Sequence, residues 1–86
     1  MIQRLSVPVS VQLIYDYKTG KAYPRDVLWK EKHYRITKIG LHHTFYGGRV
    51  LYHVFSVSTQ SMFLRLVLDS ATLHWKLEEI SDGLPD

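Results

Sequence analysis

The 86-residue chain contains no cysteine. Disulfide bridges and thiolate zinc sites are therefore excluded, so side-chain packing and strand pairing must supply the stability. The chain also lacks an apolar run near the roughly 18 residues that a membrane-spanning helix needs. Its first residues, MIQRLSVPVSV, lack the apolar core and cleavage site of a secretory signal peptide. These absences favour one small cytoplasmic domain with a modest hydrophobic core.

Charge is unevenly distributed along the chain, although the formal net charge is only +3. Residues 18–49 hold eight basic and two acidic side chains, a net charge of +6. Residues 50–86 hold two basic and five acidic side chains, a net charge of −3. This asymmetry indicates an anion-binding face, and a chance distribution of solvated charges is the simpler alternative.

Alternating apolar residues dominate the stretch from Met62 to Ile80. With a turn at Ser70–Ala71, Leu68 pairs with Leu73, and the period of two places six apolar side chains on one face. These six are Leu64, Leu66, Leu68, Leu73, Trp75 and Leu77. The pattern predicts a half-buried hairpin that forms much of the core, because a one-residue slip would expose that face.

The first third of the chain contains one long strand and one short strand. Alternation predicts the long strand from Val7 to Tyr17, and Gly20 suits the turn that follows it. Pro24 cannot donate to a strand ladder, so residues 23–26 are expected to form an extended connection. The short strand covers residues 27–29.

Two turns and a bend organise the middle of the chain. Glu31–Lys32 is expected to be the tip of a hairpin, and a strand follows from Tyr34 to about Phe45. Gly40 is the natural place for a bulge in that strand. Gly47–Gly48 is the strongest turn signal and leads into a strand over residues 49–59. A last turn at Gln60–Ser61 aligns that strand with the hairpin of residues 62–80.

Residues 1–86 therefore read as a single all-β domain. Five to six strands with short connections and no convincing helix predict an antiparallel meander, either a small SH3-like barrel or a strongly curved sheet. Residues 81–86 include Gly83 and Pro85 and are expected to be a frayed tail.

Three sequence fragments carry a family resemblance. They are Pro24 with Val27-x-Trp29 and Tyr34-x-Ile36, then Leu66-x-x-Asp69-x-x-Thr72-x-x-Trp75-x-Leu77, and finally Ile80-Ser81-Asp82. Together they resemble small bacterial all-β domains of unknown function, some of which are encoded near translesion DNA polymerases. The chain departs from that family in lacking tryptophans after the Ile36 strand. The resemblance implies a setting in DNA processing and assigns no catalytic residue.

Basic and aromatic side chains alternate through residues 18–49. Cations bind phosphates and flat rings stack on bases, so this chemistry is typical of surfaces that bind single-stranded nucleic acid. The candidate binding residues are Lys30, Lys32, Arg35, Lys38, Arg49 and Tyr46. If Trp29 and Tyr34 instead belong to the core, only a solvated cationic loop remains.

The chain has five histidines, and the predicted Gly47–Gly48 turn sets His42 opposite His53. Two imidazoles at that spacing could hold zinc or nickel with a third ligand such as His33. No carboxylate stands at metal-site spacing beside them. A hydrogen-bonded histidine pair is therefore the preferred interpretation, and the sequence predicts neither a metal nor a cofactor.

No motif for catalysis is present. The chain has neither a nucleophile elbow nor a glycine-rich phosphate loop. Asp69 and Thr72 are explained as turn residues whose side chains bond to nearby backbone groups. The chain is therefore predicted not to be an enzyme.

Two functional hypotheses follow. The first is a non-enzymatic binding or accessory module that associates with nucleic acid or a DNA-processing protein through its basic and aromatic face. The alternative is a homo-oligomeric protein-interaction module without a nucleic-acid role. The nearly uncharged strand from Val7 to Tyr17 supports this alternative, because an unpaired strand edge can add a strand of a partner.

Overall fold

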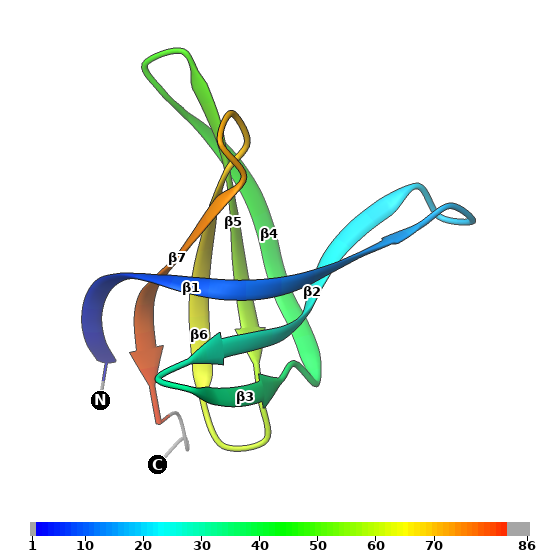
Figure 1. The fold of residues 1–86 in the computed structure, drawn as a ribbon. Coiled ribbons are helices and arrows are strands. Elements are labelled where there is room, and N and C mark those ends of the chain that lie inside the picture. The colour runs from blue at the N-terminus through cyan, green and yellow to red at the C-terminus, as the bar shows by residue number, and fades with distance from the viewer. Residues whose placement is uncertain (1, 83–86) are drawn as a thin grey trace.

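The computed structural model describes residues 2–82, which form seven antiparallel strands and no helix (Figure 1). The strands are β1 (Ile2–Asp16), β2 (Lys21–Trp29), β3 (Lys32–Arg35), β4 (Lys38–Gly47), β5 (Val50–Ser58), β6 (Phe63–Asp69) and β7 (His74–Ser81). The predicted all-β antiparallel class is confirmed, with one strand more than the predicted maximum of six. Within these residues no helix exists that could cross a membrane.

All seven strands belong to one sheet in the order β3-β2-β1-β7-β6-β5-β4. This is the order of an up-and-down barrel that is open between β3 and β4. The closed SH3-like barrel is therefore wrong, and the sheet is instead open and bent on itself. Figure 1 shows β1, β2 and β3 running across β4 to β7, with the core between these two layers.

The long strand β1 connects the two layers. Its first half, from Ile2 to Val9, pairs with β7, and its second half, from Ser10 to Asp16, pairs with β2. The predicted strand at this place is confirmed and begins earlier than predicted. Its proposed role as an unpaired edge is wrong, because each half already has a partner strand. The two edges of the sheet are β3 and β4.

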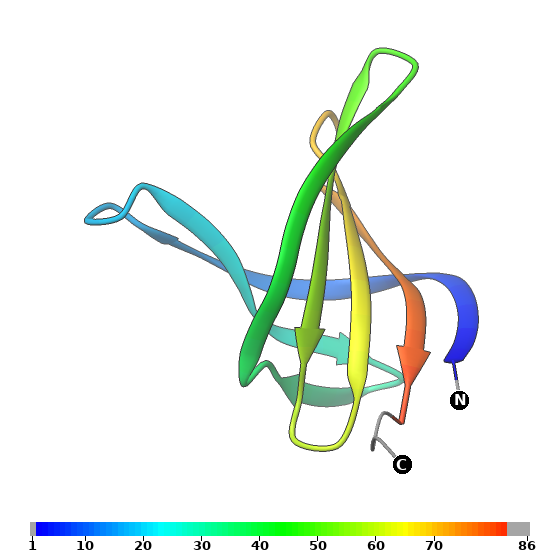
Figure 2. The same cartoon turned by 180° about the vertical axis from the view of Figure 1, so that it is seen from behind.

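The chain turns a corner at Ile36 and Thr37, which divides the single strand predicted for residues 34–45 into β3 and β4. The Ile36 N–H donates to the Arg25 carbonyl at 2.9 Å, and the Thr37 N–H donates to the Ser58 carbonyl at 2.8 Å. These bonds tie the corner to β2 on one side and to β5 on the other. Beyond it β2 and β4 diverge (Figure 2). The predicted bulge at Gly40 is confirmed between Ile39 and Leu41.

Pro24 lies inside β2 rather than in an extended connection. It faces Leu13 beside a bulge in β1, and β3 pairs with β2 only from Asp26 onward. Because a bulge stands on one side and no strand on the other, the missing proline N–H breaks no ladder bond. This is the physical reason why the prediction for residues 23–26 was wrong.

Two predicted hairpin tips are displaced by one residue. The β2–β3 turn is formed by Lys30 and Glu31, whose φ angles are 52° and 61°, and the β4–β5 turn by Gly48 and Arg49. The turn predicted at Gln60–Ser61 is correct, since Val57 pairs with Leu64 as expected. Each error shifts the paired residue by two positions, so every side chain stays on its predicted face.

The hairpin of residues 62–80 supplies much of the core, as predicted. Five of its six predicted inner side chains are buried: Leu64, Leu66, Leu68, Trp75 and Leu77. Leu73 is 69% exposed, because the loop takes four residues rather than two and Leu73 adopts a positive φ of 65°. Ser81, predicted to start a frayed tail, ends β7, and residues 83–86 of that predicted tail lie outside the described part.

We predict that Leu66→Ala lowers the free energy of unfolding by about 2–5 kcal/mol, because it leaves a cavity among fully buried side chains. The matched control is Leu73→Ala in the same hairpin, which is expected to change it by less than about 0.5 kcal/mol. Urea unfolding followed by tryptophan fluorescence measures both. Equal destabilisation by the two substitutions would contradict the observed loop.

Candidate binding surfaces

Four of the predicted site residues lie at the two ends of β3 and are called here the corner cations: Lys30, Lys32, Arg35 and Lys38. Lys30 and Lys32 belong to the β2–β3 turn, whereas Arg35 and Lys38 flank the Ile36–Thr37 corner. All four are exposed, and none forms an ion pair with another residue of the described range 2–82. Their positive charge is therefore available to an external anion.

The nearest acidic side chain on β2 is already engaged. The Asp26 carboxylate accepts from the His33 ring at 2.7 Å, across the β2–β3 pair. The glutamates Glu78 and Glu79 of β7 face Arg65 of β6, at 3.1 and 3.7 Å. Glu31 lies between Lys30 and Lys32 in the sequence, but no ion pair joins it to a corner cation within residues 2–82.

The aromatic part of the predicted face is largely structural. Trp29 packs against the core, and its ring centre lies 6.2 Å from that of Tyr34. The Lys30 Nζ lies 4.7 Å from the Trp29 ring centre, and the Lys32 Nζ lies 5.8 Å from that of Tyr34. Each ring thus already carries a cation on one face. The geometry supports the interpretation of both rings as hairpin-stabilising rather than as platforms for bases.

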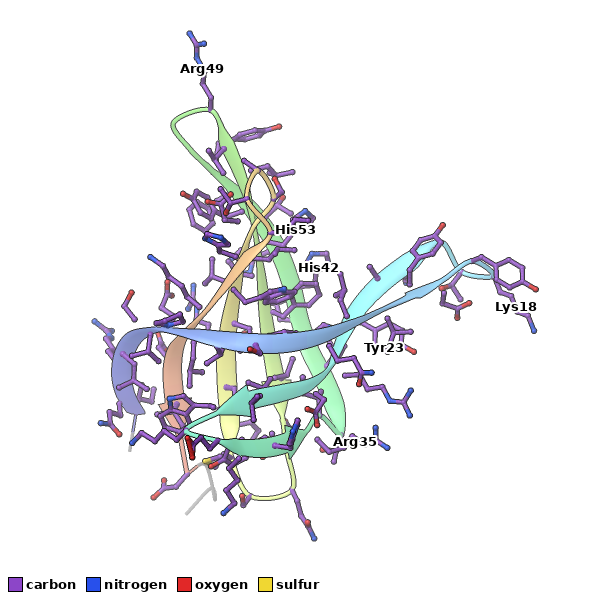
Figure 3. The ribbon with its side chains drawn as sticks, in the orientation of Figure 1. Lys18, Tyr23, Arg35, His42, Arg49 and His53 are labelled. Atoms are coloured by element: carbon purple, nitrogen blue, oxygen red, sulfur yellow. The ribbon has the colours of Figure 1, made fainter. Side chains whose placement is uncertain are left out.

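Arg49 and Tyr46 are separated from the corner cations. Both belong to the β4–β5 hairpin, and Figure 3 places Arg49 at its tip, at the opposite end of the molecule from Arg35. The Tyr46 side chain is 73% exposed. The structure therefore divides the predicted basic and aromatic face into two distant parts.

A groove of about 650 Å³ lies on the open side of the sheet, between the β1–β2 hairpin and β4 to β6. Its walls are mainly apolar and include Leu13, Tyr23, Ile39, Phe55 and Leu68. No local sequence pattern predicts this groove, because its walls come from strands far apart in the chain. We call it the open-side groove.

His42 and His53 meet in this groove (Figure 3). They are diagonal rather than directly opposed, because His42 pairs with Phe55 and His53 with Thr44. His42 Nε2 and His53 Nδ1 share a hydrogen bond of 2.9 Å, in which one nitrogen donates and the other accepts. The His42 ring also stacks on Phe55 at 4.2 Å. The predicted proximity of the two histidines is thus confirmed in a different register.

The pair supplies only two possible metal ligands. Within residues 2–82 no group of three histidine or acidic side chains is close enough to hold a metal ion. His33, the third ligand considered, bonds Asp26 on the β2–β3 hairpin instead. Partial burial, followed by the charges of His53 and His43, lowers the pKa of His42 below its ordinary value of 6.5.

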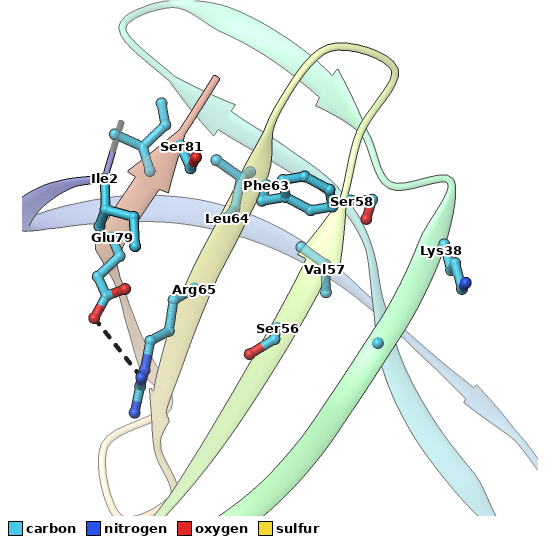
Figure 4. Close-up of a pocket in the computed structure, with 12 residues that line it drawn as sticks. Ile2, Lys38, Ser56, Val57, Ser58, Phe63, Leu64, Arg65, Glu79 and Ser81 are labelled. Carbon is cyan, nitrogen blue, oxygen red and sulfur yellow. Dashed lines mark ion pairs between the residues drawn. The ribbon is translucent and has the colours of Figure 1, made fainter. Parts of the chain in front are cut away.

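A second hollow of about 430 Å³ lies over β4 to β7 (Figure 4). Ser56, Arg65 and Glu79 contribute polar groups to it, and Arg65 is paired with Glu79. Lys38, one of the corner cations, also lines this hollow and has no ion pair within residues 2–82.

Several of the described hydroxyl groups serve turns. The Thr59 hydroxyl accepts from the Met62 N–H at 3.0 Å, and the Thr72 hydroxyl accepts from the His74 N–H at 3.3 Å. The Asp69 carboxylate accepts from the Ala71 and Thr72 N–H groups, which is the turn role predicted for it.

Comparison of the chain with known protein families, curated proteins and solved structures gives no match.

We predict that acidification destabilises the fold partly through His42. Because its pKa is lowered in the folded state, the unfolded chain binds more protons below about pH 6.5, so stability is full above that pH and falls as pH drops toward the lowered pKa. His42→Gln should therefore lose less stability between pH 7.5 and pH 5.5 than the wild type. Urea midpoints at both pH values measure this, and parallel losses would contradict it.

Proposed function

We propose that the protein is a non-enzymatic, cytoplasmic binding module whose corner cations hold the phosphate backbone of nucleic acid. The observation that carries this proposal is the group of four exposed cations without an acidic partner in the described part of the chain. Exposed lysine and arginine side chains without an acidic partner supply the electrostatic attraction for nucleic acid.

The mode of binding follows from the rings beside these cations. Trp29 is packed on the core. Lys30 covers one face of the Trp29 ring, and Lys32 covers one face of the Tyr34 ring. Base stacking therefore contributes little, and contacts to phosphates dominate. Phosphate contacts carry no sequence information, so we expect similar affinity for oligonucleotides of different sequence.

The proposed module acts as an accessory to another protein. The resemblance to bacterial domains encoded near translesion DNA polymerases supports, by analogy, a module that works beside a DNA-processing protein. Because four cations offer few phosphate contacts, the domain alone would hold nucleic acid weakly. A partner that tethers the domain near nucleic acid would raise the effective concentration of the domain at that site.

A homo-oligomeric interaction module is the second candidate. The free edge of β4 supports it, because exposed strand edges pair readily with another chain. Light scattering distinguishes the two functions, since this candidate requires a dimer at micromolar concentration in the absence of nucleic acid.

We predict that the affinity for an oligonucleotide falls steeply with salt. Four phosphate contacts give a log–log slope of about −3 to −4 on duplex DNA, so raising salt from about 50 to about 200 mM weakens binding roughly a hundredfold. Fluorescence anisotropy with a labelled oligonucleotide measures the slope. An affinity that does not change with salt would rule out this phosphate-led mode.

We predict that the triple substitution Lys30→Glu, Lys32→Glu and Arg35→Glu weakens oligonucleotide binding at least about tenfold at low salt, because it removes three of the four contacts. The control carries the same charge change at exposed lysines elsewhere, as Lys18→Glu, Lys21→Glu and Lys76→Glu. The control is expected to keep most of the affinity. Equal loss in both variants would show that net charge alone, and not the corner, attracts the nucleic acid.

A further inference from the structure

The outer edge of β4 is one of the two free edges of the sheet in the described chain. This strand has β5 on one side and no strand on the other. From Leu41 to Gly47 the edge contains no charged residue, no proline and no bulge. Natural proteins usually protect long edges with such features, because unpaired N–H and C=O groups template the addition of a strand. This edge is therefore suited to pair with another chain.

The open-side groove lies beside this edge. Ile39 and His42 of β4 form one wall, and Leu13 and Tyr23 of the β1–β2 hairpin form the other. Leu13 is 42% exposed and Tyr23 is 37% exposed, although both are large and largely apolar. A strand added to β4 would place alternate side chains in this groove and cover that apolar surface.

The charges around the groove select the chemistry of the added strand. No carboxylate lines the groove, and Lys21 is the charged residue that does. Asp16 pairs with Lys21 across the β1–β2 ladder and lies outside the lining, and its carboxylate accepts from the Lys18 N–H at 2.9 Å. Lys18 and Arg49 stand at the tips of the two hairpins that diverge around it (Figure 3). An acidic segment would be attracted to these surroundings, and a basic one would be repelled.

A second copy of the chain fits less well as the occupant. Antiparallel pairing of two β4 edges would bring Lys38 of each copy toward the Gly47–Arg49 end of the other. The like charges of Lys38 and Arg49 would then oppose the pairing. The charge pattern therefore favours a different protein.

We propose that the free edge of β4 takes an extended, acidic segment of a partner protein as an eighth strand, with alternate apolar side chains of that segment in the open-side groove. Main-chain hydrogen bonds to Leu41–Gly47 supply the pairing, and the groove and its surrounding cations supply selectivity. This binding is separate from nucleic-acid binding at the corner cations and does not depend on it.

The test measures amide hydrogen exchange by NMR, on the full chain without nucleic acid. The probe is an end-blocked peptide of alternating valine and glutamate, seven residues long to match the free edge. We expect it to slow exchange of the outward-facing amides between Leu41 and Gly47. A peptide with proline at every second position, which lacks the required N–H groups, should give no protection.

Paired substitutions at Ala22 test the charge argument. Ala22 lines the groove and is exposed, so polar replacements there do not disturb the core. Ala22→Glu should weaken binding of the acidic peptide roughly tenfold, and Ala22→Lys should strengthen it by a similar factor. A purely structural effect of substitution would change the affinity in the same direction in both variants.

Three results would overturn the proposal. The first is the absence of protection in β4 at millimolar peptide when light scattering shows a monomer. The second is a dimer whose β4 amides are already protected, which would assign the edge to a second copy. The third is protection of Leu41–Gly47 by an oligonucleotide and not by the peptide, which would assign the edge to nucleic acid.

Discussion

The divided pairing of β1 is the constraint on which the rest of the structure depends. Because Ile2–Val9 pairs with β7 and Ser10–Asp16 pairs with β2, the same strand belongs to both layers. The sheet must therefore bend along β1, and this bend brings Val27 of one layer onto Leu66 and Leu77 of the other in one core. The pairing also carries the β1–β2 hairpin past β4, which creates the open-side groove (Figures 1 and 2).

The sequence predicted which side chains face the core better than it predicted the lengths and positions of the loops. Burial follows from the period of two, so Leu64, Leu66 and Leu68 could be assigned to the core without knowing any turn. Loop length depends instead on local backbone conformation. Lys30, Glu31 and Leu73 adopt positive φ although none is glycine, which residue type does not reveal. Next to each turn the register error was two residues, so the core prediction survived everywhere except at Leu73.

The candidate site was less predictable because it depends on contacts between distant segments. The cations could be read from the sequence, but their division could not, since it arises where the corner at Ile36 and Thr37 directs β3 and β4 apart. The His42–His53 contact was found because a single hairpin makes it. The open-side groove combines Leu13 with Phe55 and Leu68, and no local pattern connects those positions.

Binding at the corner cations and binding in the open-side groove differ in how strongly they depend on salt. Contacts between exposed cations and phosphates gain most of their free energy from counterion release, so salt weakens them strongly. Strand addition gains its free energy from backbone hydrogen bonds and apolar burial, which salt screens little. Salt screens only the attraction between Lys21 and the acidic side chains of the added segment. The two surfaces can therefore be separated by ionic strength alone. In the two proposals taken together, a partner segment bound to β4 would keep the corner cations close to nucleic acid at salt concentrations where the domain by itself would release it.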